Sequence, residues 1–236
     1  MDFEKVVAPL LTLVPGTDIV RFGSGFFVRI SGEVFLTTTA HLCDFELAPR
    51  AEWDVWANQI FLIDTKSSLG EGEMTTLANF ELFTPDHDNE RVPRFKYLLR
   101  AERPGTIADL ILIPIQTDNP VLDMYDAFDL PADIGAHMAG EMVTQLGRRS
   151  DFPALSVAQH HSTQSAGPVR IMFPNGQEGD SGGPAIDKGG NLVGMNVGSH
   201  VNLSDHAMLM SPEAIVALAA SVNGVVPNWP QFAPAS

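Results

Sequence analysis

Short apolar runs rich in β-branched and aromatic residues dominate the chain, and turn-forming Gly, Pro, Asn or Asp bounds each of them. The clearest runs cover residues 24–30, 33–39, 59–64, 106–115, 169–173 and 191–197. No helical periodicity separates these runs, as it would in a chain of βαβ units. The pattern therefore predicts an all-β fold, a barrel or a sandwich.

One segment has the pattern of a helix. Residues 211–222, SPEAIVALAASV, begin with Ser211 as a candidate N-cap, and Pro212 follows at the first helical position. We expect a single C-terminal α-helix here.

The organisation of the chain points to two halves. Residues 116–135 are polar, acidic and interrupted by proline, which makes them the best candidate for a linker. We therefore predict an N-terminal unit over 1–118 and a C-terminal unit over 119–236. The first 17 residues have acids before a short apolar run and lack the basic leader of a secretory signal, so we interpret them as a first strand.

Composition narrows the possible partners and the compartment. The 236 residues carry 29 acidic and 14 basic side chains, a formal net charge of −15, which disfavours nucleic acid and anionic membranes as partners. No apolar run approaches the roughly 20 residues that cross a bilayer. Cys43 is the only cysteine, so no intramolecular disulfide forms, and we expect a cytoplasmic protein.

The stretch EGDSGGPAID, residues 178–187, places Ser181 among glycines. A serine becomes a nucleophile only when a base takes its proton and a third group orients that base. Gly-Asp-Ser-Gly-Gly formally fits the nucleophile elbow of α/β-hydrolases, but that elbow needs a following helix and the order Ser, acid, His. Here Pro184 follows at once, whereas His41 and Asp109 precede the serine, each beside an apolar run.

Four motifs in this order resemble those of the trypsin-like, chymotrypsin-fold serine peptidases. They are Gly-Ser-Gly-Phe-Phe-Val at 23–28, Thr-Ala-His at 39–41, Ala-Asp-Leu at 108–110 and Gly-Asp-Ser-Gly-Gly-Pro at 179–184. The resemblance implies two packed antiparallel six-stranded β-barrels with a C-terminal helix. The active site would lie between the barrels, with His41 and Asp109 on the first and Ser181 on the second.

The resemblance also implies a role for each residue. Ser181 attacks a carbonyl carbon, His41 is general base and then general acid, and Asp109 orients His41. The backbone N–H groups of Gly179 and Ser181 form the oxyanion hole. The alternatives are a structural turn serine, a hydrogen-bonded interior histidine and a capping aspartate.

Specificity is less clear from the sequence. Alignment to the family places Asn175 near the base of the S1 pocket and Asn196, Val197 and Gly198 along its side. No carboxylate stands at the floor, so we expect a neutral P1 residue, polar or modest in size. Asn196 stands roughly where viral 3C-type and glutamyl-specific relatives have a histidine, which argues against a preference for acidic residues or glutamine. Asp180 needs a partner other than a new amino terminus, and the candidates are Arg148, Arg149 and Arg170.

The expected function is a cytoplasmic serine endopeptidase that cleaves protein or peptide substrates through an acyl-enzyme, with a regulatory protein partner as a possible control. The alternatives are a pseudoprotease that serves as a binding module and an esterase on the same fold.

We expect no cofactor and no metal. The acidic segment 84–90 could suit calcium, but a solvated loop is the simpler interpretation, and the adjacent His160 and His161 lack a second pair with metal-ligand spacing.

Overall fold

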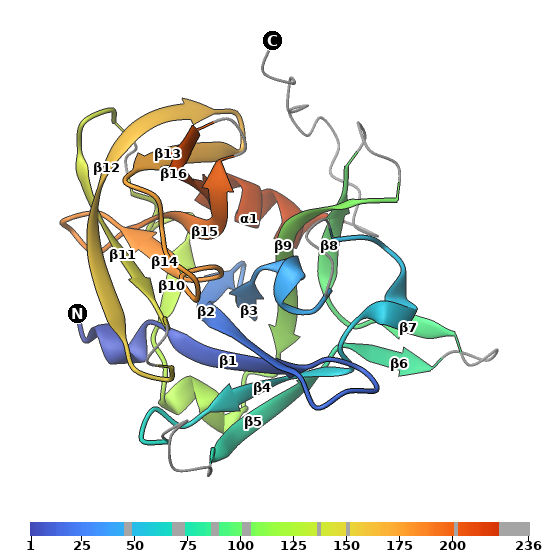
Figure 1. The fold of residues 1–236 in the computed structure, drawn as a ribbon. Coiled ribbons are helices and arrows are strands. Elements are labelled where there is room, and N and C mark those ends of the chain that lie inside the picture. Colours follow the sequence, from blue (N-terminus) through green and yellow to red (C-terminus); the bar gives the residue numbers. More distant parts are fainter. Residues whose placement is uncertain are drawn as a thin grey trace.

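The computed structural model describes residues 1–44, 49–67, 74–85, 90–100, 105–135, 138–149, 152–200 and 203–221. Strands make up most of this part of the chain, and they form two groups that follow one another in sequence (Figure 1). None of its helices has the length and apolar content that a membrane-spanning helix needs.

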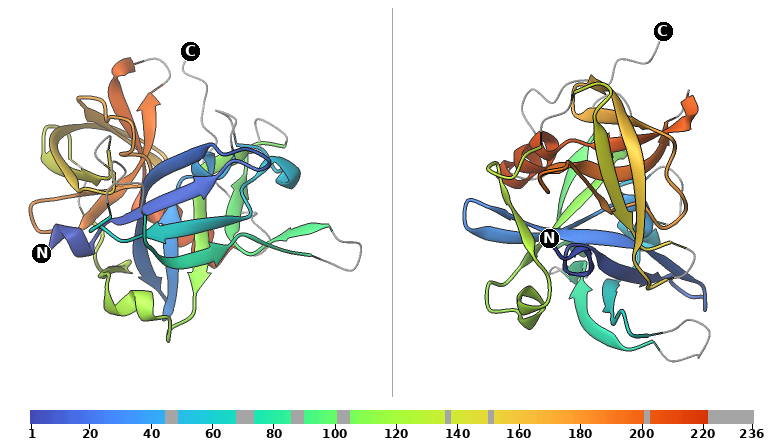
Figure 2. Two further views of the ribbon diagram at one scale, coloured as in Figure 1. Left: turned by 60° about the horizontal axis from the view of Figure 1, so that its bottom comes forward. Right: turned by 90° about the vertical axis from the view of Figure 1, so that its left-hand side faces the viewer.

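The first group is a curled sheet with strand order β5-β4-β1-β2-β3-β9-β8, in which all neighbours are antiparallel. Its strands are β1 Ala8–Leu13, β2 Val20–Ile30, β3 Glu33–Thr38, β4 Gln59–Ile63, β5 Thr76–Glu81, β8 Lys96–Leu99 and β9 Ile107–Ile115. The hairpin of β6 Phe83–Pro85 and β7 Arg91–Pro93 extends away from this sheet (Figure 2).

The second group is a closed barrel with strand order β11-β12-β13-β16-β15-β14. Its strands are β11 Met142–Gly147, β12 Ser156–Ala166, β13 Val169–Phe173, β14 Pro184–Ile186, β15 Leu192–His200 and β16 Leu203–Met210. The predicted all-β class is thus confirmed. The C-terminal unit is a closed six-stranded barrel, whereas the N-terminal sheet curls without closing in the described residues.

The segment predicted as a linker contributes to the first sheet. After a short 3-10 helix at Pro120–Asp123, strand β10 at Ala127–Leu130 pairs in parallel with β2, from Ala127 opposite Phe27 to Leu130 opposite Ile30. Phe128 and Leu130 are buried there. Residues beyond the predicted boundary at 118 therefore pack on the first sheet, and the division into two units stays a prediction.

The C-terminal helix forms as expected. Helix α1 spans Pro212–Ala220, and the Ser211 side chain caps it by accepting a hydrogen bond from the Ala214 N–H. Its buried face, with Ile215 and Leu218, joins a hydrophobic cluster that draws residues from both strand groups. The helix thereby packs against β15 of the barrel and against β8 and β9 of the sheet (Figure 1).

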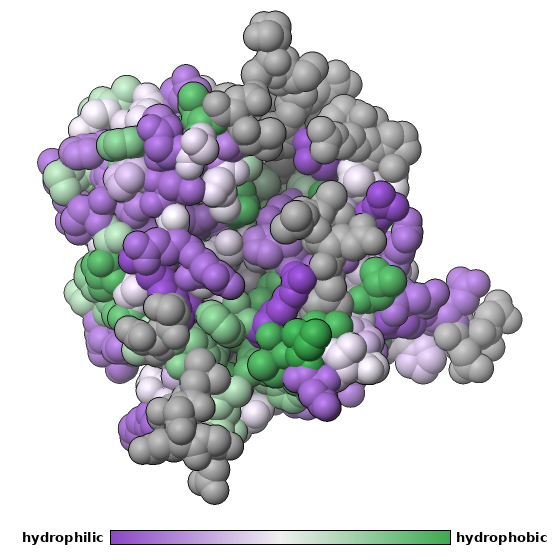
Figure 3. Space-filling view, viewed as in Figure 1, coloured by the Kyte–Doolittle hydropathy of each residue, from purple (hydrophilic) through white to green (hydrophobic). Residues whose placement is uncertain are grey.

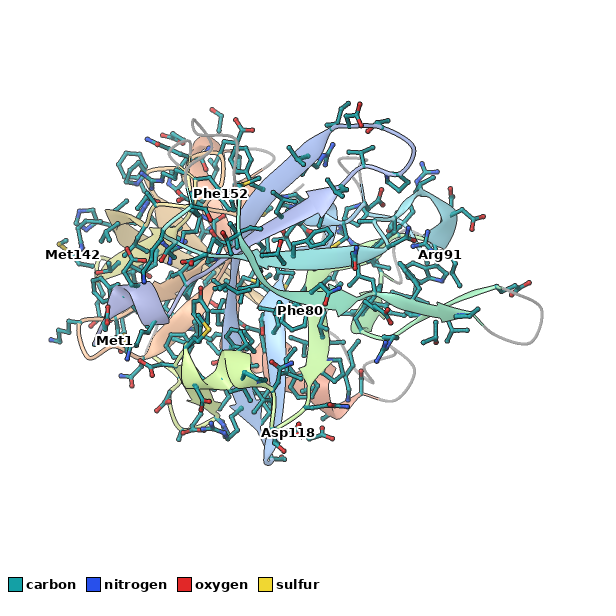
Figure 4. All side chains as sticks on the ribbon, turned by 90° about the horizontal axis from the view of Figure 1, so that it is seen from below. Met1, Phe80, Arg91, Asp118, Met142 and Phe152 are labelled. Atoms are coloured by element: carbon teal, nitrogen blue, oxygen red, sulfur yellow. The ribbon has the colours of Figure 1, made fainter. Side chains whose placement is uncertain are left out.

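A second contact, apart from that of helix α1, joins the two groups of strands. Phe152, which follows β11, packs against Phe22 of β2 with ring centroids 5.2 Å apart. Figure 4 shows Phe152 where the two groups of strands meet. Buried contacts on two sides hold the groups in a fixed arrangement, which any site between them requires.

Candidate active site

His41 and Asp109 are positioned by two neighbouring strands of the first sheet, β3 and β9. His41 lies in the 3-10 turn Ala40–Leu42 that follows β3, and Asp109 is the third residue of β9, which pairs with β3. The His41 backbone N–H donates to Asp109 Oδ1 at 2.9 Å, and ring Nδ1 lies 2.6 Å from Oδ2. Because an ionised carboxylate only accepts, Nδ1 carries the ring proton and Nε2 keeps a free lone pair in the neutral ring.

The same pair sets the protonation of His41. Burial of the ring lowers its pKa, but the charge of Asp109 and its hydrogen bond outweigh burial, and the net effect raises the pKa above the ordinary 6.5. The charge of Arg21 opposes this rise. His41 is therefore a stronger base than a free imidazole.

Ser181 lies in the loop between β13 and β14, and backbone hydrogen bonds fix its position. Its carbonyl oxygen accepts from the Ser24 N–H at 3.0 Å, and the next residue, Gly182, donates to the Asn196 carbonyl at 2.8 Å. Both His41 and Ser181 line one pocket of about 310 Å³. Its other lining residues are Val20, Arg21, Phe22, Gly23, Thr39, Leu42, Glu178 and Gly179.

The backbone at Gly179 and Ser181 has two N–H groups that are unpaired within the described part of the chain. Gly179 has φ +89°, and a Cβ added there would lie 2.2 Å from the Arg148 carbonyl oxygen, so only glycine fits. Among the described residues, neither the Gly179 N–H nor the Ser181 N–H donates a hydrogen bond. Two free N–H groups beside the pocket can stabilise an oxyanion.

Ser24 holds this loop against the first sheet. Its hydroxyl donates to the Gly179 carbonyl at 2.7 Å and accepts from the Arg148 N–H at 2.8 Å. Ser24 belongs to the motif at 23–28, but no role for its side chain was predicted from the sequence. Its position between two glycines inside a strand is the signal that could have revealed a close approach of another backbone.

No family model matches the chain, and no curated protein matches it. Several solved structures, in contrast, match the chain in fold. The Rv3671c protease from M. tuberculosis, in its active form, is 16% identical with a TM-score of 0.55, over 94% of this chain and 82% of that one. Protease Anisep from Arthrobacter nicotinovorans is 15% identical with a TM-score of 0.54, over 92% of this chain and 96% of that one. The serine endoprotease from Yersinia pestis is 13% identical with a TM-score of 0.52, over 90% of this chain and 60% of that one.

The chain has the trypsin-like serine protease fold. This confirms the resemblance found in the sequence. At such identities the likeness concerns the fold, so the role of each residue in the chain is argued from its own geometry.

Within this trypsin-like fold, Asp180 has a clear partner. Its carboxylate accepts two hydrogen bonds from Arg149, at 2.7 Å and 2.8 Å, and a third from the Gln177 N–H. The Asp180 side chain is 2% exposed. The other two candidates bind elsewhere, Arg148 to Glu4 and Arg170 to Glu213. An internal arginine, Arg149, thus holds the loop that carries Ser181.

The predicted S1 residues lie on two segments that face each other. Asn175 donates from Nδ2 to the Ser199 hydroxyl at 2.6 Å, which joins the loop before Ser181 to β15. Asn196 is buried, and its Oδ1 accepts from the Gly198 N–H. None of Asn175, Asn196, Val197 and Gly198 lines the pocket that holds His41 and Ser181, so their substrate contacts stay predictions.

The first sheet forms one wall of this pocket, and apart from His41 no residue of that wall was predicted from the sequence as a site residue. Arg21 lies there and donates to the His41 carbonyl at 3.2 Å, and Val20 is 41% exposed. Figure 3 shows an apolar patch over the turn between β1 and β2, where Leu13, Ile19 and Val20 are exposed.

Cys43 does not compete with Ser181 as a nucleophile. It is fully buried, and burial raises the pKa of its thiol far above the ordinary range. A thiol that stays protonated is inert as a nucleophile. Residues 86–89 of the acidic segment lie outside the described residues, and in the described part no group of three or more His, Cys, Asp or Glu could hold a metal.

Proposed function

We propose that the protein is a serine endopeptidase with His41, Asp109 and Ser181 as its catalytic triad. One observation carries the proposal. His41, with its Nδ1 bound to Asp109 and its Nε2 free, shares a pocket with Ser181 and with the unpaired N–H groups of Gly179 and Ser181. A base, an orienting acid, a hydroxyl and an anion site are the parts that acyl transfer needs.

The proposed reaction has two halves. The Ser181 hydroxyl oxygen bonds to the carbonyl carbon while its proton moves to His41 Nε2, and the N–H groups of Gly179 and Ser181 stabilise the oxyanion. The C–N bond then breaks, and His41 gives its proton to the leaving amine. Water next attacks the acyl-enzyme, His41 takes a proton from it, and return of that proton to Ser181 releases the carboxylic acid and the free enzyme.

The proposed substrate is a protein or peptide. The trypsin-like fold of the chain and of the proteases with similar structures supports this choice over an ester. A cytoplasmic location and control by a regulatory protein partner belong to the proposal as well, and both rest on the sequence.

Replacement of the nucleophile tests the proposal. We expect wild type to react with a fluorophosphonate probe and to cleave a library of unstructured peptides, and Ser181→Ala to lose the reaction with the probe and at least about 10⁴-fold in kcat. Ser165→Ala on the exposed face of β12 is the matched control and should behave like wild type. Equal cleavage by Ser181→Ala and wild type would refute the proposal, as would a wild type that neither reacts nor cleaves. Turnover of esters with no peptide cleavage would refute the peptidase assignment.

A further inference from the structure

Three buried polar atoms in the C-terminal barrel have no hydrogen-bond partner among the described residues. They are Gln145 Oε1, His160 Nε2 and Asn196 Nδ2. Gln145 is 0% exposed, His160 2% and Asn196 1%. A buried polar atom without a partner is costly, so three of them in one barrel call for a functional explanation.

The remaining contacts of each side chain fix whether its free atom donates or accepts. Asn196 Oδ1 accepts from the Gly198 N–H, so Nδ2 is a donor. Gln145 Nε2 donates to the Leu146 carbonyl, so Oε1 is an acceptor. His160 Nδ1 lies 2.8 Å from the Pro174 carbonyl and must carry the proton, which leaves Nε2 as an acceptor in the neutral ring.

Burial favours the neutral form of His160. Burial lowers its pKa below the ordinary value and outweighs the hydrogen bond to Pro174, which raises it. The three residues thus offer one donor and two acceptors, with no charge among them.

All three side chains lie against the loop that carries Ser181. The Asn196 N–H donates to the Gly183 carbonyl at 2.9 Å, and a Cβ added to Gly176 would lie 2.8 Å from Asn196 Nδ2. His160 holds Pro174, two residues before Gly176. A Cβ added to Gly183 would lie 3.1 Å from Gln145 Nε2. The three side chains therefore border Pro174 and Gly176 before Ser181 and Gly183 after it.

We propose that these three residues select a P1 side chain that ends in a primary carboxamide, that of glutamine or asparagine. A carboxamide oxygen accepts from Asn196, and its two N–H groups donate to Gln145 and His160, so each free atom gains a partner. A P1 carboxylate only accepts and would face two acceptors. A P1 ammonium or guanidinium only donates and would leave Asn196 unpaired, and an aliphatic side chain would leave all three unpaired.

The inference rests on the proposed function, since a P1 residue exists only if Ser181 attacks the adjacent carbonyl. It adds Gln145 and His160 to the predicted S1 residues, keeps the neutral P1 residue expected from the sequence, and departs from that expectation in including glutamine. Because the three side chains are covered, a P1 side chain must separate the loop before Ser181 from β15. The Asn175–Ser199 hydrogen bond is one contact that has to open.

Peptides that differ only at P1 test the inference. We expect kcat/KM with P1 Gln or Asn to exceed that with Glu, Leu and Lys by about tenfold or more, because a site built for hydrogen bonds rejects side chains that leave its groups unpaired. His160→Phe should reduce this ratio, because it removes one of the two acceptors proposed for the P1 carboxamide. His161→Phe, an exposed neighbour on the opposite face of β12, should keep the wild-type ratio.

The fluorophosphonate reaction separates the two proposals, because the probe needs an active Ser181 and no P1 carboxamide. A reactive wild type with equal kcat/KM for Gln, Leu and Glu would overturn the P1 inference alone. An unreactive wild type would overturn the proposed function and the inference with it. If His160→Phe fails to fold, Asn196→Leu replaces it, and the wild-type P1 profile decides the matter by itself.

Discussion

Asp109→Asn is expected to lower kcat about 10⁴-fold and to leave the fold intact. An asparagine amide can donate to His41 Nδ1, which moves the ring proton to Nε2, the atom that has to accept the proton of Ser181. The asparagine oxygen can still accept from the His41 backbone N–H, which now donates to Asp109 Oδ1 at 2.9 Å. The loss would therefore be one of chemistry, and steady-state kinetics on a peptide substrate measures it.

The pH dependence of the same variant adds a second readout. The base must be neutral, so kcat/KM rises as pH rises through the pKa of His41. Asp109 raises that pKa, and its replacement should move the acid limb of the profile to lower pH. Asp129→Asn, in an exposed pair with Arg29, is the matched control and should change neither quantity. A residual kcat within tenfold of wild type for Asp109→Asn would exclude Asp109 from the triad.

Arg149→Leu is expected to destabilise the protein by about 3–5 kcal/mol, because it leaves the charge of Asp180 buried without its partner. The Asp180 side chain is 2% exposed and accepts two hydrogen bonds from Arg149. The free energy of unfolding in urea measures the loss. The rate of fluorophosphonate labelling should fall as well, since Asp180 also orders the loop through the Gln177 N–H.

Two further variants serve as comparisons for the stability of Arg149→Leu. Arg29→Leu breaks an ion pair whose side chains are 48% and 57% exposed, and we expect it to cost about 0–1 kcal/mol. The double variant with Arg149→Leu and Asp180→Asn removes the buried charge and should recover part of the lost stability. A loss below about 1 kcal/mol in Arg149→Leu would show that the Asp180–Arg149 pair does not hold the loop.

The parts of the fold that the sequence predicted are those with strong local signals. The runs at 169–173 and 59–64 became β13 and β4 because short runs rich in β-branched, aromatic and other apolar residues between turn formers favour strands. Ser211 and Pro212 marked the start of α1 because capping is a local interaction. The motif around Ser181 was visible because a tight approach of backbones requires glycine.

The features that the sequence did not predict depend on distant contacts. Strand β10 is short, and its pairing with β2 follows from the tertiary arrangement, which no local pattern encodes. The choice of Arg149 over Arg148 for Asp180 depends on which of two adjacent side chains faces the loop. Gln145 and His160 were not predicted as candidate site residues because their place beside the loop that carries Ser181 depends on the register of β11 and β12 and on the course of that loop.

We propose that a histidine from the other half of the molecule activates Ser181, and mass spectrometry of wild type after reaction with a fluorophosphonate is the sharpest test of this step. We expect one stoichiometric adduct on the peptide that contains Ser181, and strongly reduced labelling in His41→Ala. An adduct on another residue, or labelling of Ser181 that does not depend on His41, would contradict it.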